Sequence, residues 1–422
     1  MAAEDIKMND FTALFLVALT GSFAIEYWLS RRQAAHVRTH REQVPEAFRE
    51  TVSAEAHRKA ADYTLDKIRL GDIDRVLGIG VLLLFTLGGG IAWIESFWTG
   101  LSLSPLLTGV GLILSVLLAI QLIELPLSLY QTFVIEQRHG FNRNTPTQFI
   151  KDLLLQTVLS FAIGAPLLAL ILWVMDSTGH AWWLLAWAIV MGFSIFMSWA
   201  FPTFIAPLFN TFTPLPDATL RARIEALLKR CGFASKGIFV MDGSRRSGHG
   251  NAYFTGIGDS KRIVFFDTLV GSLEHDELEA VLAHELGHFK CRHVIKMLLT
   301  SAVISLIGFA LLGWLSQQSW FYEGLGVTER SNAAALLLFM LVMPVFTVFL
   351  KPVMAFFQRR YEFEADAFAA RHSEARHLVS ALVKLYRENA STLTPDPLYA
   401  AFHYSHPPAA IRIDHLLSQH HG

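Results

Sequence analysis

Long apolar segments alternate with polar, charged segments along the 422-residue chain. A helix needs about 20 mainly apolar residues to cross the hydrocarbon core of a bilayer, and seven segments approach that length. They are Phe11–Leu29, Val76–Trp98, Leu106–Ile123, Leu153–Met175, Trp182–Pro202, Met297–Leu315 and Ala333–Leu350. The third continues as a helix past Pro126 towards Glu136. The pattern predicts a mainly α, integral-membrane protein with seven transmembrane helices.

The segment between the fifth and sixth spans has a different pattern. Asp217–Cys231 has helical periodicity, and a second helix is predicted from near Ser272 to about His293. Between them lie three short β-rich runs separated by Gly and Asp turns: Gly237–Met241, Ala252–Gly256 and Arg262–Asp267. We therefore expect four parts: five spans in residues 1–208, a small α/β insert in 209–296, two spans in 297–356 and a C-terminal segment in 357–422.

Composition supports a membrane protein over a larger soluble one. Hydrophobic residues make up 53% of the chain and charged residues 17%, whereas soluble domains carry about 25% charged residues. The net charge of -1 gives no reason to expect a nucleic-acid partner. Two cysteines, Cys231 and Cys291, are too few for a disulfide framework.

The distribution of Lys and Arg predicts the orientation in the membrane. These residues gather between spans one and two, between spans three and four, and after spans five and seven. The loops Thr99–Pro105 and Asp176–Ala181 contain none. We therefore expect the insert and the C-terminal segment to share the cytosolic side, with the N-terminus outside.

The insert contains His284-Glu285-Leu286-Gly287-His288. Helix positions four apart share a face, so the two imidazoles can converge on one metal ion while Glu285 activates a water molecule. The alternative is a solvated helix that happens to carry two histidines. A catalytic zinc site needs a third protein ligand and one open position.

Glu362 is the candidate third ligand, because the hairpin of spans six and seven returns the chain to the same membrane face. Asp366 lies four residues further on and can support a ligand histidine or donate a proton. Glu364 is the rival ligand, but it points to another helix face. The alternative for Glu362 is an ordinary juxtamembrane ion pair with Arg359 or Arg360.

The chain also offers groups that could stabilise an oxyanion. His406, in the run Phe402-His403-Tyr404-Ser405-His406-Pro407-Pro408, is a candidate donor, and Arg412 can hold the same loop or contact substrate. The alternative is a structural turn, for which His-Pro-Pro is common.

Several runs resemble the type I CAAX prenyl endopeptidase family, and the resemblance covers nearly the whole chain. The matching runs are Tyr130–Glu136, His139–Asn142 with Thr145, Asn251–Gly256, His284–His288, Glu362–Asp366, Pro397–Tyr399 and His403–Pro408. The resemblance implies one zinc ion on His284, His288 and Glu362, with Glu285 and Asp366 as acid/base residues. It also implies seven helices around a water-filled chamber, and an edge strand at Asn251, Ala252 and Tyr253 that pairs with the substrate backbone.

The resemblance implies two partners: the lipid bilayer, and a peptide or protein substrate that can be prenylated at a C-terminal CAAX motif. The alternative function is quality control of membrane proteins. Glu364 departs from the family, which commonly has an uncharged residue there. The chain ends soon after Ser418 without a dilysine signal, so we expect a prokaryotic plasma membrane rather than the endoplasmic reticulum.

Three alternative functions fit the sequence less well. A site-2-type protease would bury its zinc helix in an apolar span, but charged residues such as Lys290 and Arg292 follow this motif. The shorter heat-shock membrane metalloproteases lack the extra spans and the His139–Asn142 run. A transporter or receptor with a structural metal leaves Glu285 without a role, because structural sites usually have four protein ligands.

Overall fold

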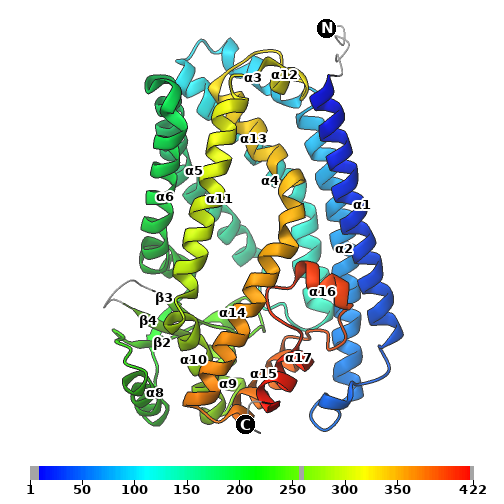
Figure 1. Ribbon diagram of the computed structural model, residues 1–422, viewed down its shortest axis with the longest axis vertical. Coiled ribbons are helices and arrows are strands. Elements are labelled where there is room, and N and C mark those ends of the chain that lie inside the picture. Colours follow the sequence, from blue (N-terminus) through cyan, green and yellow to red (C-terminus); the bar gives the residue numbers. More distant parts are fainter. Residues whose placement is uncertain (1–8, 256–260, 419–422) are drawn as a thin grey trace.

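The computed structural model describes residues 9–255 and 261–418. Long helices run along the longest dimension of the molecule, and the small sheet lies at one end with the C-terminal helices (Figure 1). The first seven helices are α1 (Asp10–Thr39), α2 (Ala54–Phe85), α3 (Gly90–Gly100), α4 (Pro105–Tyr130), α5 (Pro146–Ser177), α6 (Trp182–Ala200) and α7 (Ala206–Phe209). After the sheet region come α11 (His293–Leu315), α12 (Ser319–Glu323), α13 (Asn332–Thr347), α14 (Lys351–His372), α15 (Ala375–Glu388), α16 (Pro397–His403) and α17 (Ala409–Ser418).

The number of membrane spans agrees with the prediction. Six helical segments of the described chain are long and apolar enough to cross a bilayer, and the bent pair α2 and α3 supplies a seventh. The predicted extension of the third span is present, because α4 continues as a π-helical segment over Gln131–Glu136. The last span is longer than predicted: its helical path runs from Asn332 to His372 and carries Glu362 beyond the apolar part.

The prediction of one continuous helix over Val76–Trp98 is wrong. The chain breaks between Phe85 and Gly90, and α2 and α3 meet at 49°. Gly89 has φ +74°, a left-handed conformation that glycine adopts without strain. A Cβ at Gly88 would lie 2.7 Å from the Leu84 carbonyl oxygen. Three consecutive glycines therefore allow a bend that apolar periodicity alone does not reveal.

The rest of the protein covers the spans unevenly. In their most apolar windows the buried share ranges from 0% in α11 to 50% in the last span. A helix buried in a solid bundle would have most of its circumference covered. Figure 1 shows the long helices standing apart around the centre.

A four-stranded sheet forms the core of the insert. Its strands are β1 (Phe212–Pro214), β2 (Ile238–Met241), β3 (Ala252–Thr255) and β4 (Arg262–Phe266), in the order β1-β2-β4-β3. The last three were predicted, except that Gly256 lies outside the described residues. β1 was missed, since it is only three residues long and ends in Pro214, a residue tolerated at a sheet edge. β3 pairs with β4 alone, Ala252 opposite Phe265, so it is the other edge.

The remaining helices of the insert pack against this sheet. They are α8 (Ala218–Arg230), α9 (Asp267–Ser272) and α10 (His275–Lys290). Asp217 caps α8, as its side chain accepts a hydrogen bond from the Leu220 N–H at 2.9 Å. The predicted helix over Ser272–His293 is thus α10, and it ends where Arg292 adopts a left-handed φ of +57°. Buried apolar residues of α10, α14 and α15 continue the core of the sheet.

Candidate metal centre

Two packed helices carry the motif residues. α10 holds His284, Glu285 and His288, and α14 holds Glu362 and Asp366. These two helices make the most extensive helix–helix contact in the described chain. The hairpin of α11 and α13 separates them in sequence and returns α14 to the side of α10 (Figure 1).

The close approach of α10 and α14 depends on Gly287. A Cβ at this position would lie 2.8 Å from Ala365 Cα and 3.0 Å from its carbonyl oxygen. Any side chain there would force the helices apart, because backbone atoms cannot yield to a contact this short. Ala365 lies between Glu362 and Asp366, so the contact sets the height of both carboxylates against the two histidines.

Three side chains converge as a metal site would require. His288 Nε2 lies 3.2 Å from His284 Nε2 and 3.2 Å from Glu362 Oε1, and His284 Nε2 lies 3.5 Å from Glu362 Oε2. One ligand atom from each residue falls within 4.8 Å of the others. Neither Arg359 nor Arg360 pairs with Glu362 among the ion pairs of the described chain; Arg359 instead donates to three carbonyls, those of Ala400, Ala401 and Tyr404.

The donor set fits a divalent metal. Glu362 is 5% exposed, and its buried Oε2 atom makes no hydrogen bond of good geometry: His284 Nε2 and Arg412 Nη1 approach it only to 3.5 Å. A buried carboxylate oxygen without such a bond is costly, and a cation between the three side chains would satisfy it. Two imidazoles, one carboxylate and an open side are the ligand set of catalytic zinc sites.

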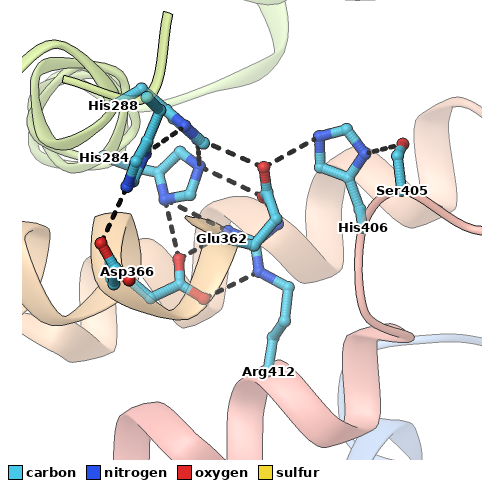
Figure 2. A network of polar contacts seen from close by, with 9 residues as sticks. His284, His288, Glu362, Asp366, Ser405, His406 and Arg412 are labelled. Atoms are coloured by element: carbon cyan, nitrogen blue, oxygen red, sulfur yellow. Dashed lines mark hydrogen bonds and ion pairs between the residues drawn. The ribbon is translucent and has the colours of Figure 1, made fainter. Parts of the chain in front are cut away.

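Asp366 and Arg412 set the orientation of His284 (Figure 2). Asp366 Oδ1 lies 2.8 Å from His284 Nδ1, so the Nδ1–H is donated to the carboxylate and Nε2 is left free for a metal. Arg412 donates twice to Asp366, at 2.6 and 2.9 Å. Asp366 has no exposed side-chain surface and Arg412 has 7%. The geometry favours a supporting role for Asp366 over proton transfer to substrate.

His284 titrates unusually in the metal-free protein. Burial and the nearby Arg412 disfavour a charged imidazole, but the hydrogen bonds to Asp366 and Glu362 outweigh them and raise the pKa of His284 to about 9. Metal ligation requires the neutral form. A metal ion must therefore displace a proton from His284 near neutral pH.

A second chain of contacts begins at His288. Its Nδ1 atom lies 3.1 Å from Nδ1 of His293, whose Nε2 lies 3.0 Å from Glu364 Oε2. Glu364 also faces Lys296 Nζ at 3.3 Å. Donation from His288 to His293, and from His293 to Glu364, again leaves His288 Nε2 free for the metal. Glu364 therefore supports His288, a candidate ligand, through His293. Its distance from the motif along the sequence did not reveal this position.

Cys291 also lies in this second cluster. Its sulfur, His293 and Glu364 have ligand atoms within 4.8 Å of one another. Lys296 beside Glu364 opposes a cation there, and the two nitrogens of His293 already have partners. The arrangement therefore fits hydrogen bonding to His288 better than it fits a second metal.

Two residues expected in the chemistry remain available to a ligand. Glu285 is half-buried, and its carboxylate has no hydrogen bond or ion pair with the described part of the chain. His406 is 63% exposed on its side chain, with Nε2 3.3 Å from Glu362 Oε1. Ser405 Oγ lies 2.9 Å from its Nδ1. Arg412 lies next to this loop, because its backbone N–H donates to the Pro408 carbonyl at 3.2 Å, and its buried side chain contacts both Asp366 and Glu362.

The substrate-strand residues lie on β3 and just before it. Asn251 is exposed, and its side-chain oxygen accepts from the Ala252 N–H at 2.8 Å. Ala252 packs towards the core of the insert, and the Tyr253 ring lies edge-on to Phe266. The outer edge of β3 has no strand partner in the described chain.

The loop before β3 is anchored by residues that the sequence did not single out. Asn389 Oδ1 accepts from the Gly250 N–H at 3.1 Å. The His249 ring stacks on Phe141 at 4.3 Å, and Tyr63 donates to Glu136 at 2.6 Å beside it. The runs Tyr130–Glu136 and His139–Asn142 therefore support the insert from the membrane side.

Comparisons with known proteins give the family. Residues 33–211 match the model of the CAAX prenyl protease N-terminal region, five membrane helices, and residues 214–420 match peptidase family M48. CAAX prenyl protease 1 homolog of Arabidopsis thaliana is 35% identical over 402 residues, which cover 93% of this chain and 94% of that protein. The human CAAX prenyl protease 1 homolog is 31% identical, covering 96% of each chain.

A solved structure agrees with the sequence matches. The crystal structure of S. mikatae Ste24p superposes with a TM-score of 0.89 at 31% identity, covering 97% of this chain and 99% of that one. The structural similarity covers almost the full length of the chain, so it includes the spans, the insert and helices α10 and α14. The chain is therefore an integral, multi-pass membrane protein that belongs to the CAAX prenyl protease 1 family and to peptidase family M48.

Proposed function

We propose that the protein is a zinc metalloendopeptidase that holds one zinc ion on His284, His288 and Glu362. The observation that carries this proposal is the convergence of the Nε2 atoms of His284 and His288 on the buried carboxylate of Glu362, with one ligand atom of each residue within 4.8 Å of the others. The tautomers imposed by Asp366 and His293 turn both nitrogens towards the same point. Family membership makes the protein a peptidase with a metal cofactor; the choice of zinc rests on the ligand set.

The residues of the site have different roles in hydrolysis. When bound, zinc would polarise the scissile carbonyl and make a water molecule more acidic. Glu285 takes the proton of the attacking water and passes it to the leaving amine. His406 is exposed near Glu362 and donates a hydrogen bond to the developing oxyanion. Asp366 and Arg412 hold His284 in place and do not touch the substrate.

The substrate is an extended peptide that adds to the free edge of β3. Main-chain hydrogen bonds then supply affinity, and Asn251, Ala252 and Tyr253 border the added strand. The names of the relatives suggest removal of C-terminal residues after a prenylated cysteine. Cleavage of misfolded membrane proteins is the second role, and it would not require a prenyl group.

The active site faces the cytosolic side of the membrane. The cytosolic orientation rests on the Lys and Arg that cluster in the loops on the side of the insert. A cysteine placed near Asp259, which lies outside the described residues, should react only with a membrane-permeant reagent in intact cells. Reaction with an impermeant reagent would show the opposite orientation, with the insert outside the cell.

Purified protein in lipid vesicles tests the function. A chelator should abolish cleavage of a peptide with a farnesylated C-terminal CAAX sequence, and one equivalent of zinc should restore it. The unprenylated peptide separates the two roles: equal cleavage of both peptides favours quality control, and preference for the farnesylated one favours CAAX processing. Full cleavage after complete zinc removal would contradict the proposal.

A further inference from the structure

A cavity of about 630 Å3 lies between α1, α2 and the C-terminal helices α15 and α16, on the side of the molecule that carries the metal centre. Four tyrosines contribute to its lining: Tyr63, Tyr386, Tyr399 and Tyr404. Two cations, Lys67 and Arg75, line it as well, and no carboxylate of the described chain does. Its lining therefore favours an anionic ligand.

The cavity adjoins both parts of the candidate active site. Tyr404 lies two residues before His406, and His249, also in the lining, lies two residues before Asn251. The hydroxyl of Tyr386 interacts electrostatically with both Arg412 and Glu362. The cavity therefore borders both the loop before β3 and the loop that carries His406.

The lining contains an unsatisfied donor. Gln33 is 1% exposed, and its Oε1 atom accepts from the Asp396 N–H at 2.7 Å. Its Nε2 atom is buried and makes no hydrogen bond of good geometry, although the Gln33 side chain interacts with the Tyr404 hydroxyl, which also lines the cavity. Buried donors are normally paired, so this N–H group suits an acceptor supplied by a ligand.

The two cations are not equivalent. Arg75 already pairs with Asp72 at 2.8 Å. Lys67 forms no ion pair within 4 Å in the described chain; its Nζ lies 5.0 Å from the centre of the Tyr63 ring and interacts with Glu136 only at longer range. Lys67 is therefore the cation that a ligand anion can engage.

We propose that this cavity binds the C-terminal carboxylate of the peptide substrate, with Lys67 as its counter-ion and Gln33 as a hydrogen-bond donor. The inference rests on the proposed removal of C-terminal residues. An extended tripeptide spans about 10 Å at 3.3 Å per residue, so a fixed carboxylate would place one particular peptide bond at the metal. The cavity would thus set how many residues are removed.

Two substrates that differ only at the C-terminus test the proposal: one farnesylated CAAX peptide with a free carboxylate and the same peptide as its amide. Wild-type protein should cleave the acid with a kcat/KM about tenfold higher, the effect of one charge-assisted hydrogen bond. Lys67→Gln should bring the ratio of acid to amide close to one. Gln33→Glu, which keeps the acceptor for Asp396 N–H and adds a negative charge, should reverse the preference.

Lys59→Gln is the matched control. Lys59 lies on the same helix, 4.9 Å from the centre of the Phe141 ring and outside the cavity lining, so this variant should keep the wild-type ratio. Equal cleavage of both peptides by wild type, or an unchanged ratio in Lys67→Gln, would overturn the proposal while leaving the peptidase activity established. A loss with Lys67→Gln that appears only in vesicles containing anionic lipid, at an unchanged ratio, would also overturn it by assigning the cavity to a lipid phosphate.

Discussion

The Nε2 atom of His293 lies 3.0 Å from the Oε2 atom of Glu364. This hydrogen bond fixes His293 so that its other nitrogen can accept from His288 at 3.1 Å. Two residues, His288 and His293, therefore separate Glu364 from the proposed metal site, although Glu364 lies only two residues from Glu362. Outer partners of this kind hold a ligand imidazole in the tautomer and orientation that bind metal.

Alanine substitutions should separate the two glutamates. Glu362→Ala removes a ligand and should lose zinc even when zinc is in excess. Glu364→Ala should weaken zinc binding by no more than roughly 10- to 100-fold, the usual effect of losing a residue that bonds a ligand directly, and should still load at high zinc. Competition with a zinc chelator measures both affinities, and elemental analysis measures the stoichiometry.

The same measurements would reveal an error in the choice of the third zinc ligand or in the number of metal sites. If Glu362→Ala keeps full zinc while Glu364→Ala loses it, the third ligand is wrong. If the wild type holds two zinc ions per chain and Cys291→Ser holds one, the cluster of Cys291, His293 and Glu364 is a second metal site.

Zinc affinity should depend on pH through His284. Its pKa is raised to about 9 in the metal-free protein, above the ordinary value of about 6.5. The protonated imidazole therefore stabilises the metal-free fold fully below about pH 6.5, and this stabilisation is lost as the pH rises towards 9. Zinc needs the neutral imidazole, so its apparent affinity should rise about tenfold per pH unit between roughly pH 7 and 9.

Titration calorimetry in buffers of different ionisation enthalpy tests this directly. About one proton should be released by His284 when zinc binds at pH 8. Asp366→Asn removes an acceptor that raises this pKa, so the affinity should level off at a lower pH. An affinity that does not change between pH 7 and 9 would show that His284 is already neutral in the metal-free protein.

Asn251→Ala tests the edge strand. Asn251 is exposed at the start of β3, and its backbone carbonyl accepts from the Phe266 N–H at 2.9 Å, a bond that the substitution keeps. The side-chain amide is free to donate to a peptide. We expect kcat/KM to fall about tenfold, or roughly 1.4 kcal/mol, with zinc content and thermal stability near those of wild type.

A peptide series gives the complementary control for strand addition. N-methylation should block cleavage only at those substrate residues whose N–H points at β3, which alternate along an extended strand. A well-folded, zinc-loaded Asn251→Ala protein with unchanged kcat/KM, together with uniform tolerance of N-methylation, would place the substrate elsewhere.

Local patterns predicted much of the fold. Apolar length identified the spans, and β-rich runs between turns identified β2, β3 and β4. The break at Gly88–Gly90 was not predicted, since its residues continue the apolar pattern and only backbone sterics distinguish a bend from a straight helix. The short strand β1 has too few residues for its periodicity to be recognised.

Only part of the metal centre could be predicted from the sequence. His284 and His288 lie four apart on one helix, and the hairpin of α11 and α13 suggested Glu362. The contacts of Arg412 with Asp366 and of His293 with His288 join side chains through tertiary packing, so spacing along the chain could not reveal them. Gly287 was part of the motif, but its packing against Ala365 became visible only with both helices in place.

Glu285→Gln tests the central claim most directly, because it changes the proposed base and leaves every proposed ligand in place. The variant should bind about one zinc per chain with wild-type affinity, since the Glu285 carboxylate makes no hydrogen bond or ion pair with any of the three ligands in the described structure. Its kcat should fall by a factor of about 10² to 10⁴, the contribution of a positioned general base. A zinc-loaded Glu285→Gln protein that cleaves the peptide at the wild-type rate would contradict the account.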